Sequence, residues 1–146
     1  MNNNALISIK TDLLYEDDNS DSLEMITQGQ YCRLNNGEYT IKYSESDPEN
    51  TGNVETTVTI TPAGLVTVER EGDIYSHMVF EQGQKHLVHY ETEYGSLTVG
   101  ISAKKVAAVL SDTGGDLEID YSVEIDNAVA SDNSLKVNVR FPNLPS

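Results

Sequence analysis

Apolar and polar residues alternate with a period of two over long stretches of this 146-residue chain. In "LEIDYSVEI" (117–125), apolar side chains occupy every second position, and acidic residues or serine lie between them. "LKVNVRF" (135–141) repeats the pattern. Successive side chains of a strand point to opposite faces, so each stretch predicts a strand with one buried and one solvated face. The alternation therefore favours an all-β fold.

Turn residues separate the strand-like stretches at short intervals. Glycine recurs in "NNGE" (35–38), "TPAG" (61–64), "EQGQ" (81–84) and "DTGGD" (112–116), and Asn36-Gly37 indicates a two-residue hairpin loop. Connections this short favour an up-and-down antiparallel meander of about 8–10 strands, because a Greek key needs longer crossings. Closing the meander into a β-barrel would remove its two open edges. The predicted strands are 5–16, 22–34, 38–46, 53–61, 65–71, 74–81, 85–93, 96–110, 117–127 and 134–141.

Two segments are less regular than the rest. "SAKKVAAVLSD" (102–112) is part of a predicted strand, but its three alanines leave a short helix as an alternative, on helix propensity alone. "DNAVASDN" (126–133) is predicted as the loop that joins the last two strands. We predict one barrel domain over residues 1–146, a usual domain size, with loose tails at 1–4 and 142–146.

Charge and cysteine content narrow the class of protein. The chain has 24 acidic and 9 basic residues, a net charge of −15. Nucleic acids and anionic membranes are bound mainly through Lys and Arg, so we expect neither as a partner. A membrane-spanning helix needs about 18 or more apolar residues in a row, and neither such a run nor a signal peptide is visible. Cys32 is the only cysteine, which favours a reduced, cytoplasmic setting.

Several segments, taken in order, resemble the YwiB-like family of small Gram-positive bacterial proteins. They include "GQYCRLNNGEYTIKYSES", "TTVTI", "VEREGDIYSHMVFEQGQKHLVHYETEYGSLTVGI" and "LEIDYSVEI". The similarity extends over about residues 6–141, and it implies a calycin-like, lipocalin-type β-barrel. The family supplies no catalytic residue to carry over. The motifs that carry the resemblance are Arg70 and Gly72; Met78 and Phe80; and Tyr90, Thr92, Gly95 and Leu97.

The histidines do not form a recognisable metal or catalytic site. His86 and His89 lie three residues apart and would point to opposite faces of a strand. His89 shares a face with Glu91 and Glu93, but a metal site needs a further ligand from a neighbouring strand. No nucleophile–base pattern, phosphate loop or zinc spacing is present. We therefore predict no catalytic residue, no metal and no cofactor, and an enzyme that uses His77, His86 or His89 as acid or base is the least favoured class.

Polar side chains also lie on faces that are otherwise apolar, so they would point into a closed barrel. Arg70 is in register with two valines, and Glu45 follows Tyr43 on one face. A small barrel can hold one ligand, and arginine binds carboxylate or phosphate groups well. Alternatively, Arg70 and Glu45 pair with each other at the barrel mouth. The candidate ligand-binding residues are Arg70, Glu45, Thr56, Tyr43, Tyr90 and Thr92.

The function that this sequence favours is non-catalytic binding of a small apolar or amphipathic ligand inside the barrel. In one form of this hypothesis the ligand is an anion. The alternative is an interaction protein with a filled barrel. Its outer face or an open edge would then pair with a second copy, forming a homodimer, or with a basic partner.

Overall fold

The computed structural model describes residues 5–15, 19–46, 53–72, 76–92, 95–125 and 128–141. These residues form an all-β fold, as predicted, and none of them is helical. The predicted loose tails, 1–4 and 142–146, lie outside the described residues. The ten strands are β1 (Ala5–Tyr15), β2 (Ser20–Arg33), β3 (Tyr39–Ser46), β4 (Asn53–Ile60), β5 (Val66–Glu71), β6 (Ser76–Phe80), β7 (Lys85–Thr92), β8 (Gly95–Ser111), β9 (Gly114–Ile125) and β10 (Ala128–Arg140).

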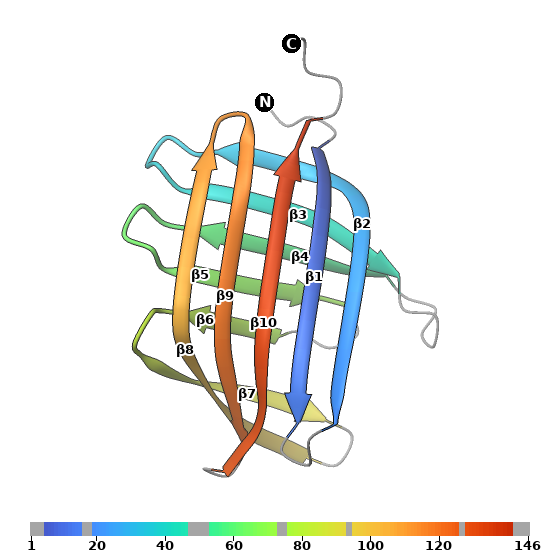
Figure 1. Ribbon diagram of the computed structural model, residues 1–146, viewed down its shortest axis with the longest axis vertical. Helices are drawn as coiled ribbons and strands as arrows, with labels where there is room; N and C mark the ends of the chain where they lie inside the picture. Colours follow the sequence, from blue (N-terminus) through green and yellow to red (C-terminus); the bar gives the residue numbers. More distant parts are fainter. Residues whose placement is uncertain are drawn as a thin grey trace.

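The strands form one antiparallel sheet that curls into a nearly closed barrel (Figure 1). The order is β6-β5-β4-β3-β2-β1-β10-β9-β8-β7, so each strand pairs with its chain neighbour, except across one seam. The first and last strands pair with each other over ten residue positions, from Leu6–Arg140 to Tyr15–Ser131. The seam lies between β6 and β7, which are consecutive in the chain but share no ladder in the sheet. The predicted meander is therefore confirmed, and its two terminal strands are inside the sheet.

β2 turns the corner of the barrel. Its first part pairs with β1 up to Gly29, and from Gly29 onward it pairs with β3. Figure 1 shows β2 bending from the direction of β1 toward that of β3. A Cβ atom at position 29 would lie 2.2 Å from the carbonyl oxygen of Lys42 and 2.5 Å from Cδ1 of Ile7. Only glycine lets the two backbones approach this closely, so Gly29 permits the corner.

β8 contains a β-bulge in the segment for which a helix was the alternative. Ala103 pairs with Tyr121 and Lys105 with Asp120, so Lys104 is the extra residue. One extra residue shifts the alternation by one position: Ala103 is buried, and both lysines that follow it are exposed. The helical alternative is wrong because the bulge breaks the period of two without ending the strand.

The bulge also fastens the seam of the barrel. The turn between β6 and β7 hydrogen-bonds to β8, through Gly83 N to the carbonyl of Ala103 at 2.9 Å and Ala103 N to the carbonyl of Gln84 at 3.2 Å. Gln82 Oε1 accepts a hydrogen bond from Val106 N at 2.9 Å. These contacts satisfy backbone groups at the bulge and join the β6–β7 turn, which crosses the seam, to β8.

The barrel interior is an apolar core to which every strand contributes. The largest side chains with almost no exposure include Phe80, Ile7, Ile41 and Leu117. Phe80 packs edge-on against Tyr121, with ring centroids 4.8 Å apart, a favourable aromatic geometry. The buried hydrophobic residues are Ala5, Ile7, Ile9, Tyr31, Ile41, Tyr43, Val58, Ile60, Val66, Val68, Phe80, Val88, Val99, Ile101, Ala103, Leu117, Ile119, Val137 and Val139.

One end of the barrel, the aromatic end, is closed by Tyr31, Tyr39 and Phe141. The two tyrosine rings stack with centroids 5.5 Å apart and planes 9° apart, and Phe141 packs at 6.1 Å from Tyr31. The Tyr31 hydroxyl donates a 2.6 Å hydrogen bond to the carbonyl of Ser111, the last residue of β8. Burial, together with Tyr39 and Asp112, raises the pKa of Tyr31. This end thus ties the ends of β2, β8 and β10 to the start of β3.

Three local predictions are wrong. The loop after β2 holds three residues, 35–37, because Leu34 N bonds to the carbonyl of Glu38 and Gly37 N to that of Leu34. The "GG" of the predicted 112–116 turn belongs to β9, which begins at Gly114. β10 begins at Ala128, so most of the predicted 126–133 loop is strand. Polar residues of strand and loop look alike in sequence, and here Ser131 and Asn133 are buried.

Candidate functional site

A polar cluster of Tyr43, Glu45, Thr56 and Arg70 forms the charged end of the barrel. Sheet register assembles it: Tyr43 of β3 pairs with Thr56 of β4, and Thr56 pairs with Arg70 of β5. Glu45 lies two residues beyond Tyr43 and therefore on the same face. The interior positions of β5 run from buried Val66 and Val68 to exposed Arg70, so the cluster lies where the apolar interior meets solvent.

Glu45 is the centre of the cluster. Arg70 Nη2 donates to Glu45 Oε2 at 2.5 Å, and the Thr56 hydroxyl donates to the same oxygen at 3.2 Å. The side chain of Arg70 is 44% exposed and that of Glu45 24% exposed, whereas Thr56 is buried. Arg70 and Glu45 thus pair at the mouth, as the structural alternative predicted. An ion pair this exposed contributes little to stability. Because the Arg70 side chain is 44% exposed, its guanidinium is also accessible to an added anion.

Tyr43 lies beneath this pair and is buried. Burial is the main cause that raises the pKa of Tyr43 to about 12, and Glu45 raises it further, while Arg70 and the hydrogen bond with Thr56 act in the opposite direction. The phenol is therefore neutral at physiological pH and available for hydrogen bonding. A neutral phenol, an arginine and a carboxylate already in an ion pair make a binding surface. They are not an arrangement of a nucleophile with a base.

The other two candidates, Tyr90 and Thr92, are at the end of β7. Their backbones pair with Leu97 and Gly95 of β8. Their side chains lie outside the described part of the structure, so their predicted place in the ligand site stays a prediction. Of the six candidates, the structure brings four into one cluster by contact or register.

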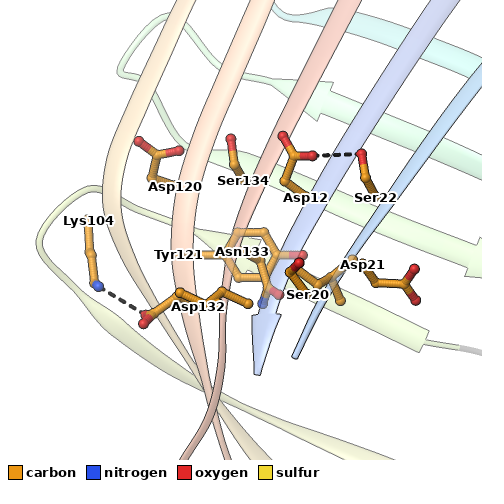
Figure 2. Close-up of a pocket in the computed structure, with 12 residues that line it drawn as sticks. Asp12, Ser20, Asp21, Ser22, Lys104, Asp120, Tyr121, Asp132, Asn133 and Ser134 are labelled. Atoms are coloured by element: carbon orange, nitrogen blue, oxygen red, sulfur yellow. Dashed lines mark hydrogen bonds and ion pairs between the residues drawn. The ribbon is translucent and has the colours of Figure 1, made fainter. Parts of the chain in front are cut away.

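A hollow that the sequence did not predict lies on the outer face of the long strands. Its volume is about 630 Å³, and β1, β2, β8, β9 and β10 line it. Ser22, Asp12, Ser134 and Asp120 form one row across four neighbouring strands, as Figure 2 shows. The row faces outward because the alternate positions along these strands carry the buried core residues. β10 was predicted to start only at residue 134, so this surface could not be assembled from the sequence.

Hydrogen bonds and an ion pair within the sheet neutralise part of the charge in this hollow. Asp132 accepts from Ser122 Oγ at 2.6 Å and from Lys104 Nζ at 3.0 Å, and the Ser122 bond, followed by the Lys104 bond, lowers the pKa of Asp132. Asp12 accepts from Ser22 at 2.8 Å. These cross-strand pairs stabilise the sheet, and they account for two of the carboxylates without any ligand.

Two comparisons with known proteins identify a family for this chain and a solved structure with a similar fold. Residues 7–137 match the model of a family described as Domain of unknown function (DUF1934). The chain belongs to this family. The fold is similar to the crystal structure of the YwiB protein from Bacillus subtilis, with a TM-score of 0.81 and 20% sequence identity over 95% of this chain and 92% of that one. A search of curated proteins gives no match.

The match to YwiB confirms the predicted YwiB-like resemblance and the barrel of this DUF1934 chain. At 20% identity it shows the fold, and a fold does not imply a function. The calycin-like and lipocalin-like classification stays a prediction. The charged end and the outer hollow must therefore be interpreted from their own chemistry.

Histidines and acidic groups in the DUF1934 barrel do not gather into a metal site within the described residues. His86 Nε2 lies 3.1 Å from Glu81 Oε1, a local contact at the start of β7. Positions 86 and 89 pair with Ile101 and Thr98 of β8, so β7 is extended there, as the spacing argument required. Among the described residues, no helix is long and apolar enough to cross a bilayer.

Proposed function

We propose that this DUF1934 barrel is a non-catalytic binding protein that takes a small amphipathic anion at its charged end. The observation that carries the proposal is the partly exposed Arg70 guanidinium at the rim of an apolar interior. Arg70 makes one hydrogen bond within the described structure, through Nη2 to Glu45. The fork of an arginine has five donors, so most remain available to a carboxylate, sulfonate or phosphate group.

The surroundings of Arg70 supply the apolar part of the site. Val68 lies two residues before Arg70 on the same face and is 6% exposed, and it pairs with Met78 of β6, a partly buried side chain that packs against the core. An apolar group placed against this wall would be removed from water, while its charged group met Arg70. Ligand sites commonly combine an apolar wall with few polar groups in this way.

The packed interior sets the depth of the proposed site. Ile41 and Val58, farther inside on β3 and β4, are 0% and 1% exposed, so a ligand would occupy the rim and the first layer beneath it. Glu45 would keep Arg70 in place and would repel any anion, so an anion would need the added contact of an apolar part with the wall to bind. The free Cys32 agrees with the cytoplasmic setting that forms part of this proposal.

The test compares three probes with the same chain but different head groups: laurate, dodecanol and dodecylamine. Each is added below its micelle concentration, and the thermal unfolding midpoint is measured. We expect laurate to raise the midpoint more than dodecanol, and dodecylamine to be least effective, because only the anion gains the contact with Arg70.

The matched variants are Arg70→Gln and Arg33→Gln. Arg33 is an exposed arginine that pairs with Asp112 at 3.5 Å and lies near the aromatic end. Arg70→Gln should abolish the difference between laurate and dodecanol, whereas Arg33→Gln should retain it. Equal shifts for laurate and dodecanol in the unmodified protein, or an equal loss in both variants, would refute an anion site at Arg70.

A further inference from the structure

β2 has one long open edge, and it arises from the corner at Gly29. Residues 20–29 pair with β1, and residues 29–33 pair with β3. On the side away from β1, residues 20–28 have no paired strand in the described part of the chain. Nine residues of strand present about 30 Å of edge. Their outward N–H and C=O groups can accept an additional strand.

This edge lacks most of the features by which proteins protect edge strands. Such edges are usually short, interrupted by bulges or marked by proline and lysine. β2 has 14 residues with neither proline nor lysine, and both its ladders run without a register shift. Leu23 and Ile26 are 64% and 66% exposed. They are three residues apart and so lie on opposite faces, which gives the edge an apolar group on each side.

Charge indicates what could pair there. From residue 11 to residue 32 the chain has six acidic residues and no basic one. On the edge itself, Asp21 and Glu24 are exposed, and the nearest cation to Glu24, Lys10 Nζ, is 3.9 Å away, with both side chains exposed. A second copy of the chain would bring another net charge of −15 to this acidic edge. A basic partner is attracted instead, and electrostatic complementarity also accelerates its association.

We propose that the open edge of β2 binds an extended, basic segment of another protein as an added strand. Main-chain hydrogen bonds to residues 20–28 would supply affinity irrespective of sequence, and alternate side chains would supply selectivity. Lysine or arginine would face Glu24 on the outer face. Apolar side chains would face Leu23 and Met25 on the inner face. This proposal is independent of the ligand site, because no residue of the charged end belongs to the edge.

The probe is a synthetic peptide in which lysine alternates with valine or leucine over seven residues, labelled for fluorescence anisotropy. A matched peptide carries the same side chains but N-methyl groups on the alternate amides of its docking edge. We expect the unmodified peptide to bind and the N-methylated one to bind about tenfold more weakly or not at all, since it keeps the charge but loses the strand hydrogen bonds.

Protein variants separate the edge from general charge attraction. Leu23→Lys and Ile26→Lys each add one positive charge to the edge and should lower the affinity for the peptide about tenfold. Val109→Lys adds the same charge at a side chain that is 76% exposed on β8, away from the β2 edge in the strand order, and should change the affinity less than about twofold. Arg70→Gln should leave peptide binding unchanged. All four positions are exposed, and circular dichroism checks their folding.

Three outcomes would overturn the proposal. Equal binding of the two peptides, or an equal loss in Val109→Lys, would mean that charge alone attracts the peptide. Absence of binding by the unmodified peptide would mean that the edge takes no basic strand. A concentration-dependent dimer in sedimentation that Leu23→Lys abolishes would assign the edge to a second copy of this chain.

Discussion

β3 contributes to both ends of the barrel, but its side chains make different kinds of contact at each end. The interior face of β3 begins with Tyr39 at the aromatic end and reaches Glu45 at the charged end, with buried Ile41 between them. At the aromatic end, Tyr31 stacks on Tyr39 and its hydroxyl bonds to the backbone of β8. At the charged end, an arginine and a carboxylate meet in partial contact with solvent. The first arrangement favours stability, and the second leaves a charged group accessible.

This difference suggests a division of roles along the barrel. Stacked aromatic rings remove a large apolar area from water and are worth more than their area alone. An exposed ion pair is worth less than about 1 kcal/mol, so selection for stability alone does not account for placing charge on an interior face. The aromatic end therefore stabilises the packing of the strands, and the charged end is the better candidate for a binding site.

The largest effect is expected from Tyr31→Ala. It removes both ring contacts and the hydrogen bond to the carbonyl of Ser111, and we expect it to lower the free energy of unfolding by about 3–5 kcal/mol. Arg70→Ala at the other end should cost less than about 1 kcal/mol. Urea denaturation of both variants measures the difference. Similar losses at the two ends would contradict the division of roles.

Alkaline pH should reveal the buried phenol of the charged end. The folded-state pKa of Tyr43 is about 12, against an ordinary value of 10.0. The contribution of the Tyr43 phenol to the free energy of unfolding is fully present below pH 10, where the phenol is protonated in the folded and the unfolded state. It is lost as the pH rises through about 12, because the unfolded state loses its proton first. The full loss is about 3 kcal/mol. Denaturation at pH 9 and at pH 11.5 measures how far the free energy of unfolding falls between the two. The fall should be smaller in Tyr43→Phe than in the unmodified protein. An identical fall in both would rule out a contribution of the Tyr43 phenol to this pH dependence.

Alternation in the sequence predicted the strands well because most of them bury one face and solvate the other. It failed where this rule is broken locally. The extra residue Lys104 shifts the alternation of β8, and Ser131 and Asn133 place polar groups on the buried face of β10. Within the described residues, Asn133 Oδ1 has no hydrogen-bond partner. Polar residues at these buried positions remove the apolar–polar alternation that indicates a strand.

The candidate site was predictable in part for a similar reason. Parity along each strand showed that Tyr43 and Glu45 share a face and that Arg70 follows Val66 and Val68. The pairing of β3 with β4 and β5 then brings the cluster together, and short hairpins make that neighbourhood foreseeable. The open edge of β2 was not foreseeable in detail, because it depends on how far β3 extends along β2 before the corner.

A smaller effect is expected from Tyr31→Phe, which retains the ring and removes only the hydroxyl. The carbonyl of Ser111 loses its donor, so the free energy of unfolding should fall by about 1 kcal/mol. Comparison with Tyr31→Ala separates ring packing from the hydrogen bond at the aromatic end. Urea denaturation at neutral pH is the measurement, and a loss as large as that of Tyr31→Ala would mean that the hydrogen bond, not the stacking, closes this end.

The smallest effect is expected for the coupling between Arg70 and Glu45. A double-mutant cycle with Arg70→Met and Glu45→Gln should give a coupling free energy of about 0.5 kcal/mol, since the Arg70 side chain is 44% exposed. Raising the salt concentration to about 1 M should reduce it further, because the screening length falls to about 3 Å. A coupling above about 2 kcal/mol that resists salt would make the pair a structural element. A weak, screened pair would instead mean that Arg70 contributes little to folding, so a loss of laurate binding in Arg70→Gln could be attributed to the lost contact itself.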